Sequence, residues 1–151
     1  MERIKLKTFE LEEYDSSNID HQKFATYFES DEEYTEYMEP FWSLENSVNY
    51  AKRNGKYSAV YYAYLDGILV GMVGLISILD MPEVVISILK EHRGNHYSRY
   101  LYQEYAEYVL KFYKEYKAIY ASIQPENIHS SKNALAAEFK QIDEYKYIKR
   151  W

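Results

Sequence analysis

The sequence has 151 residues, a net charge of −6 and no cysteine. Its length and its 47% hydrophobic content predict one folded domain over residues 1–151. The lack of cysteine excludes a disulfide framework, a zinc–thiolate site and a cysteine nucleophile. The negative charge argues against nonspecific nucleic-acid binding, which needs a basic surface.

The first residues, MERIKLKTFELEEY, are charged throughout, and no apolar run reaches about 18 residues. We therefore expect no signal peptide, no membrane association and a cytoplasmic location. The four histidines are scattered without paired ligand spacing, so we expect no metal site. Residues 10–45 carry 12 of the 24 acids and one lysine, Lys23. This segment is typical of a solvated helical face, or of a surface that favours a cationic partner.

The alternating segment RIKLKTF predicts a first strand, with Ile4, Leu6 and Thr8 on one face. A helical region follows, in which apolar residues recur at helical spacing and Pro40 is an interruption. Its last helix is expected to begin after Ser43 and to stop at Gly55.

The segments YSAVYYAYL and ILVGMVGLISI predict two strands, and Asp66-Gly67 between them predicts a hairpin turn. Gly71 and Gly74 in the second of these strands indicate close packing or a bulge. Met81-Pro82 is expected to break the chain before EVVISIL, the fourth strand.

From Tyr97 onward, apolar residues recur at three or four positions and predict a long amphipathic helix: Tyr97, Leu101, Tyr105, Tyr108, Phe112 and Tyr116. AIYASI predicts a fifth strand. A second helix is expected over Ile128–Lys140, with Ile128, Leu135 and Phe139 pointing inward, followed by a terminal strand in EYKYIKRW. This order predicts an α/β (α+β) domain with a central, largely antiparallel sheet.

The junction EHRGNHYS lies between the fourth strand and the long helix. The N-terminus of a helix has unpaired backbone N–H groups and a partial positive charge. Gly94 allows close approach of a ligand to the backbone, and Arg93 could contact an anion. Residues 93–98 therefore indicate either an anion cradle or a tight turn with a solvent-exposed Arg93.

Two segments of the sequence resemble motifs of the GNAT N-acyltransferase family. VVISILKEHRGNHYSRYLYQEYAEYVL resembles motif A, in which Arg93, Gly94 and Tyr97 match Arg-Gly-x-Gly-Tyr-Gly, while His96 and Ser98 stand where glycines are usual. PENIHSSKNALAAEF resembles motif B: Asn127, Ser130 and Phe139 fall at the family's spacing, and Glu138 replaces a glycine. The predicted strand order is similar to this family across nearly the whole chain.

This resemblance implies a mixed, mostly antiparallel sheet of six to seven strands with about four helices, and a splayed gap between the fourth and fifth strands. Acetyl-CoA would lie in that gap, with its pantetheine paired to the fourth strand through Ile86 and Ile88 and flanked by Ser87 and Leu89. Its pyrophosphate would rest on the junction, which comprises Arg93, Gly94, Asn95, His96, Tyr97 and Ser98. Asn127 and Ser130 would lie near the coenzyme A arm, although Asn127 is equally suited to be an N-cap.

The resemblance also implies direct attack of a primary amine on the thioester, with a carboxylate or a water chain as general base. Glu83 is the candidate base, against the simpler interpretation of an exposed acid at a strand end; His129 is an alternative polar group. The tyrosine that protonates the departing thiolate in this family is Ala134 here.

The early helices help to form the acceptor pocket in this family, and their acidic character here implies a cationic amine acceptor. The short tail after Phe139 implies an exposed sheet edge that a second subunit could cover, hence a homodimer. Two alternatives stay open: a catalytically impaired coenzyme A-binding or protein-interaction module, and an acidic adaptor for basic proteins.

Overall fold

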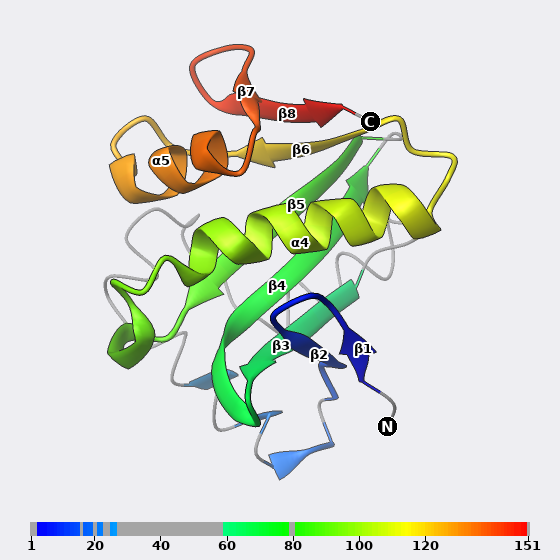
Figure 1. Ribbon diagram of the computed structural model, residues 1–151, viewed down its shortest axis with the longest axis vertical. Helices are drawn as coiled ribbons and strands as arrows, with labels where there is room; N and C mark the ends of the chain where they lie inside the picture. Colours follow the sequence, from blue (N-terminus) through cyan, green and yellow to red (C-terminus); the bar gives the residue numbers. More distant parts are fainter. Residues whose placement is uncertain are drawn as a thin grey trace.

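The described residues of the protein fold around one eight-stranded sheet (Figure 1). The computed structural model describes residues 3–15, 17–19, 21–22, 25–26, 59–78 and 81–150. The strands are β1 (Ile4–Lys5), β2 (Glu10–Glu13), β3 (Ala59–Leu65), β4 (Ile68–Ile78), β5 (Met81–Ile88), β6 (Ala118–Ser122), β7 (Lys140–Gln141) and β8 (Lys146–Arg150). The helices whose full length lies within the described residues are the 3₁₀ turn η1 (Lys90–His92), α4 (Tyr97–Phe112) and α5 (Ile128–Ala136). None of these described helices is long and apolar enough to span a membrane.

The strand order is β1-β2-β3-β4-β5-β6-β8-β7, and every neighbouring pair is antiparallel except β5 and β6. The parallel β5–β6 pair has a single register position, Glu83 opposite Tyr120, whereas β4 and β5 are paired over the eight residues Gly71–Ile78 of β4. The sheet therefore splays beyond Glu83. The predicted mixed sheet with a gap between the fourth and fifth predicted strands, here β5 and β6, is confirmed.

The strand count exceeds the prediction because the N-terminal segment forms a hairpin. The Leu6 N–H donates to the Phe9 carbonyl at 2.8 Å and closes a turn, so β1 is only two residues long and β2 follows it. Phe9 and Leu11 are fully buried. The additional strand β2 pairs with β3, and the very short β7 pairs with β8 at the other edge.

The Asp66-Gly67 hairpin between β3 and β4 is confirmed. Both residues have positive φ, 50° and 80°, as a type I′ turn requires. The bulge expected near Gly71 is also present: Ala63 pairs with Gly71 and Tyr64 with Leu69, which leaves Val70 as the extra residue. By contrast, Met81 and Pro82 do not break the sheet, because both lie in β5 and pair with β4.

The long amphipathic helix is confirmed as α4. It ends at Phe112, which is 62% exposed rather than part of the apolar face, and the buried Tyr116 lies beyond it. Its buried face packs on one side of the sheet, where it contacts β5 and β6 (Figure 1). This face comprises Leu101, Tyr102, Tyr105, Ala106, Val109 and Leu110. Burial of each large apolar side chain contributes roughly 1.5–3 kcal/mol, so this face contributes several kcal/mol to stability.

The predicted inward face of the second helix is wrong in part. Helix α5 ends at Ala136, and Ile128 and Leu135 are 61% and 49% exposed, whereas Ala134 and Phe139 are buried. Glu138 has a φ of 72°, and the Phe139 N–H donates to the Ala134 carbonyl at 3.0 Å, so the chain turns back at this point. The small Ala134 lets α5 approach its neighbours closely, which a bulkier side chain would prevent.

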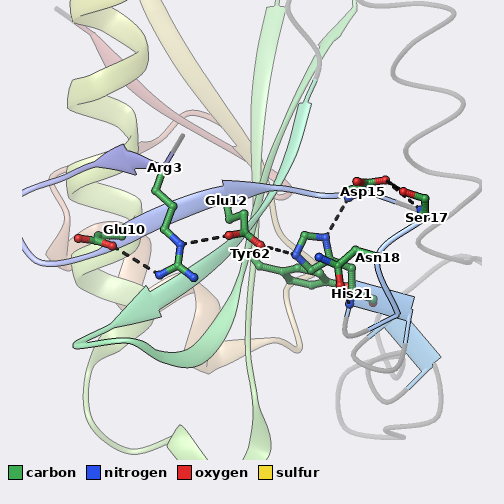
Figure 2. A network of polar contacts seen from close by, with 8 residues as sticks. All are labelled: Arg3, Glu10, Glu12, Asp15, Ser17, Asn18, His21 and Tyr62. Carbon is green, nitrogen blue, oxygen red and sulfur yellow. Dashed lines mark hydrogen bonds and ion pairs between the residues drawn. The ribbon is translucent and has the colours of Figure 1, made fainter. Parts of the chain in front are cut away.

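The opposite face of the sheet carries a second apolar cluster around Tyr62 and Met72 and a polar network at its margin (Figure 2). His21 is 1% exposed; its Nδ1 accepts the Asp15 N–H at 3.0 Å, and its Nε2 lies 2.7 Å from Glu12 Oε1. The ring proton therefore lies on Nε2. Tyr62 donates to the His21 carbonyl at 2.7 Å.

The described residues from Ile19 to Thr26 are helical, as expected. The other helices predicted before residue 59 lie outside the described residues.

Candidate functional site

The gap between β5 and β6 exposes backbone groups of β5. The Leu89 N–H donates to the Val70 carbonyl of β4 at 2.9 Å. Since backbone groups alternate sides along an extended strand, those of Ile86 and Ile88 face the other way, toward β6. Strand β6 pairs with β5 only at Glu83. The backbone N–H and carbonyl of Ile86 and the N–H of Ile88, both predicted to pair with pantetheine, therefore face the gap, whereas the Ile88 carbonyl accepts a hydrogen bond from Arg93.

The strand-to-helix junction lies at the open end of this gap. Gly94 has a φ of 89°, and the place where a Cβ would stand has no atom within 4 Å. His96, the residue before α4, also has positive φ, which explains why a glycine is usual at this position. No side chain caps the start of α4 and its first turn has no acidic residue. The first amides of α4 therefore have no carboxylate competing for them.

Two predicted anion-binding side chains instead hold the junction together. The Arg93 Nε donates to the Ile88 carbonyl at 3.1 Å, which brings its guanidinium over the end of β5. The Asn95 side chain donates to the His92 carbonyl at 3.2 Å. Both contacts fix the path of the chain between β5 and α4. The backbone amides near Tyr97 and Ser98 are thus the clearest anion donors of this segment.

The motif B residues make contacts within the protein. Asn127 is the N-cap of α5, its side chain accepting the Ser130 N–H at 3.3 Å. The Ser130 side chain forms a hydrogen bond with the Tyr102 hydroxyl of α4. Burial raises the pKa of Tyr102 to about 12, while the hydrogen bond with Ser130 acts in the opposite direction. Asn127 and Ser130 therefore fasten α5 beside the gap.

Glu83 belongs to a three-residue polar cluster at the closed end of the gap. Its Oε1 accepts a hydrogen bond from Ser122 Oγ at 2.8 Å and forms an ion pair with Lys146 Nζ. Lys146 Nζ also donates to Ser122 Oγ at 2.8 Å. No sequence pattern singles out Ser122 and Lys146, because strands β6 and β8 reach Glu83 only in the folded sheet.

This Glu83–Ser122–Lys146 cluster lies on the sheet face away from α4. Val84 and Ile88 belong to the core beneath α4, so their neighbour Glu83 points to the opposite side of β5. Ala121 and Tyr147 belong to the same core, and the alternation places Ser122 and Lys146 with Glu83. A molecule lying in the gap would thus meet α4 at one end and this cluster at the other.

The remaining candidate positions, His129 and Ala134, are not members of the Glu83–Ser122–Lys146 cluster. His129 is exposed on α5. Ala134, at the position of the family's tyrosine, is fully buried. No group of three potential metal-ligating side chains is found in the described part of the chain.

A cavity of about 330 Å³ lies between β1 and α4, lined by Lys5, Leu6, Lys7, Glu104, Glu107, Tyr108, Lys111 and Phe112. Glu104 there is 7% exposed and accepts the Thr8 N–H at 2.6 Å. None of the predicted site residues lines this cavity, so it is separate from the gap.

The shape of the fold is shared with several solved acetyltransferases. A GNAT-family acetyltransferase from Bacillus anthracis superposes with a TM-score of 0.77 at 17% identity, covering 99% of this chain and 98% of its own. Spermidine N-acetyltransferase from Vibrio cholerae, in complex with CoA and spermine, gives 0.73 at 20% identity, with 95% and 93% covered. The ribosomal L7/L12 α-N-protein acetyltransferase RimL, in complex with coenzyme A, gives 0.75 at 11% identity, with 99% and 98% covered.

None of the curated proteins matches the sequence significantly. Residues 19–135, however, match the acetyltransferase (GNAT) family. This match spans more than half of the chain and includes the gap, the junction and most of α5. The chain therefore belongs to the acetyltransferase (GNAT) family and is an acyltransferase.

Proposed function

We propose that this protein is an N-acetyltransferase that moves an acetyl group from acetyl-CoA to a primary amine by direct attack within a ternary complex. The observation that carries the proposal is the free backbone edge of β5, which leads from the Glu83 cluster to the uncapped start of α4. From Val84 to Leu89 an extended strand covers about 17 Å, which suits an extended pantetheine arm.

In this arrangement the backbone amides near Tyr97 and Ser98 hold the pyrophosphate, helped by the partial positive charge of the helix N-terminus. The backbone groups of Ile86 and the N–H of Ile88 pair with the pantetheine as an additional strand would. The thioester end then lies near Glu83. An N–H of β5 polarises its carbonyl, and Glu83 accepts the proton that the attacking amine loses.

Ala134 has no proton to donate to the departing thiolate. The ordinary pKa of a thiol is near 8.5, so a coenzyme A thiolate can leave and take its proton from water at neutral or mildly alkaline pH. Tyr102 is a poor substitute because it is buried in the core and its hydroxyl is already bonded to Ser130. We therefore assign no side chain to this proton transfer.

The acceptor is proposed to be a cationic amine. One supporting observation is the concentration of acidic residues in residues 10–45. A second is that a structurally similar protein is a spermidine N-acetyltransferase. The alternative is a coenzyme A-binding module without turnover, which Ala134 in place of a tyrosine favours.

Acetyl-CoA binding is tested first by thermal unfolding. Ligand at roughly 100 times its Kd should stabilise the protein by about 2.7 kcal/mol. Release of free thiol is then followed with a panel of polyamines, lysine peptides and neutral amines. Stabilisation followed by thiol release supports the enzyme, and stabilisation without release from any amine supports the binding module. No stabilisation refutes both.

The variant Ser98→Asp separates the proposed pyrophosphate contact from helix stability. A carboxylate in the first turn of α4 should stabilise the free protein by about 0.3–1 kcal/mol through the helix dipole. The same charge should repel the pyrophosphate and weaken acetyl-CoA binding by at least about tenfold. Ser98→Asn, which has the same shape without the charge, is the matched control and should bind nearly as the wild type does. If Ser98→Asp binds acetyl-CoA as tightly as the wild type does, the junction does not bind the pyrophosphate.

A further inference from the structure

We propose that Lys146 is a self-acetylation site, modified by the acetyl-CoA that the protein itself binds. This inference rests on the proposed function. Lys146 Nζ is bonded to Glu83 and to Ser122 Oγ, at the closed end of the gap. Its ammonium therefore occupies the place that an acceptor amine would take beside the candidate base.

The direction of β5 brings the thioester to this lysine. With the pyrophosphate at the start of α4, the pantetheine runs along β5 from Ile88 toward Glu83, against the direction of the strand. Its thioester end then lies where β5 and β6 converge at Glu83 and Tyr120. Lys146 belongs to β8, pairs with Ser122 of β6 and reaches across β6 to Glu83 at this point.

The side chains of the cluster are accessible and connected for proton transfer. Lys146 and Glu83 are 31% and 28% exposed, so the ammonium is neither sealed in the core nor fully solvated. Ser122 accepts from Lys146 and donates to Glu83, which fixes the lysine with its proton directed at the carboxylate.

The reaction balances within these groups and one acetyl-CoA. Glu83 takes a proton from the Lys146 ammonium, and the free amine attacks the thioester carbonyl. The new N–C bond forms as the C–S bond breaks. The attacking nitrogen releases its second proton through water to the departing thiolate, and Glu83 returns the first proton to solvent. The products are one amide at Lys146 and one free coenzyme A.

A second lysine on the same strand provides a contrast. Lys149 Nζ donates to the Ala137 carbonyl at 3.0 Å, and Lys149 is 9% exposed. The alternation of β8 places it on the opposite face from Lys146, away from Glu83. The two lysines thus differ in their access to a carboxylate, and only Lys146 should be modified.

The experiment incubates the purified protein with acetyl-CoA carrying a deuterated acetyl group, followed by peptide mass spectrometry with time. We expect one labelled acetyl group at Lys146, at a first-order rate independent of protein concentration, and none at Lys149. Lys132, which is exposed on α5, should react much more slowly. Glu83→Gln should reduce the rate at Lys146 by about 100-fold. Lys146→Arg should abolish that label, and Lys132→Arg should leave it unchanged.

Thermal unfolding with acetyl-CoA and thiol release with the amine panel are measured on the same samples. Stabilisation or amine turnover with no label at Lys146 overturns the inference while the proposed function stands. Labelling of Lys132 as fast as Lys146 also overturns it, because the modification is then nonselective. If acetyl-CoA neither stabilises the protein nor labels Lys146, both proposals are refuted.

Discussion

Replacement of Gly71 by alanine should push β4 and β5 apart. A Cβ on Gly71 would lie 2.3 Å from the Ser87 carbonyl oxygen and 3.2 Å from Ile88 Cα, whereas ordinary contact begins at 3.4 Å. The obstacle is backbone rather than the end of a flexible side chain, so one strand must move by about 1 Å. We expect a loss of about 3 kcal/mol, the upper end for overpacking. For a chain of this size the Tm should fall by about 6–12 °C.

The measurement is thermal unfolding of Gly71→Ala together with calorimetric titration of coenzyme A. Because Ser87 and Ile88 lie in the proposed pantetheine edge, we also expect affinity to fall by at least about tenfold. Gly67→Ala is the control: its φ of 80° strains an alanine, but no atom lies within 4 Å of the new Cβ. It should lose stability and keep its affinity. Full stability of Gly71→Ala would refute the close approach, and unchanged affinity would refute the role of β5.

Three further predictions concern acid stability, helix contacts and the core. Burial of Glu12 acts to raise its pKa, but hydrogen bonds from His21 and from Arg3 lower the pKa overall. The stabilising contribution of the Glu12 carboxylate is therefore present above its unfolded pKa, about 4.3, and is lost as the pH falls through the lower folded pKa. In Glu12→Gln, the free energy of unfolding should depend less on pH in the acid range, as measured by circular dichroism. Tyr102→Phe removes the hydrogen bond with Ser130 and should cost about 1 kcal/mol in urea unfolding. Phe139→Ala should cost about 3–5 kcal/mol in the same assay, because Phe139 is 2% exposed.

Each of these three variants has a control nearby. Glu13→Gln alters an exposed neighbouring acid, Tyr100→Phe alters a 41% exposed tyrosine of α4, and Leu135→Ala truncates a 49% exposed side chain of α5. All three should stay within about 0.5 kcal/mol of the wild type. A Leu135 variant as unstable as the Phe139 variant would contradict the orientation of α5. An unchanged acid transition in Glu12→Gln would contradict the lowered pKa.

The parts of the fold that sequence predicts well are those in which neighbouring residues carry the signal. Asp66-Gly67 defines a hairpin because both residues tolerate positive φ. The period of α4 is visible because its buried face recurs over four turns. Strand β2 was missed because Glu10, Glu12 and Glu13 make it look like a solvated segment; its pairing with β3 and the burial of Leu11 outweigh that composition.

The orientation of α5 and the Glu83 cluster depend on contacts between distant segments. Ile128 and Leu135 are larger and more apolar than Ala134, so a pattern rule turns them inward. The structure buries Ala134 instead. Ser122 and Lys146 are ordinary polar residues of short strands, and only the strand order joins them to Glu83. The resemblance to the GNAT family located the gap itself, which no local pattern predicts.

A single bridge, between Glu83 and Tyr120, joins the two halves of the sheet. One half is the meander β1–β5 and the other is β6–β8–β7; helix α4 contacts both β5 and β6 across this seam, and α5 packs on α4 and β7. Amide hydrogen exchange in the ligand-free protein should therefore resolve two sets of protection, with the C-terminal unit opening at a lower free energy. A molecule bound in the seam would contact both halves of the sheet and merge the two sets of protection into one. Ligand binding would therefore also stabilise the C-terminal strands.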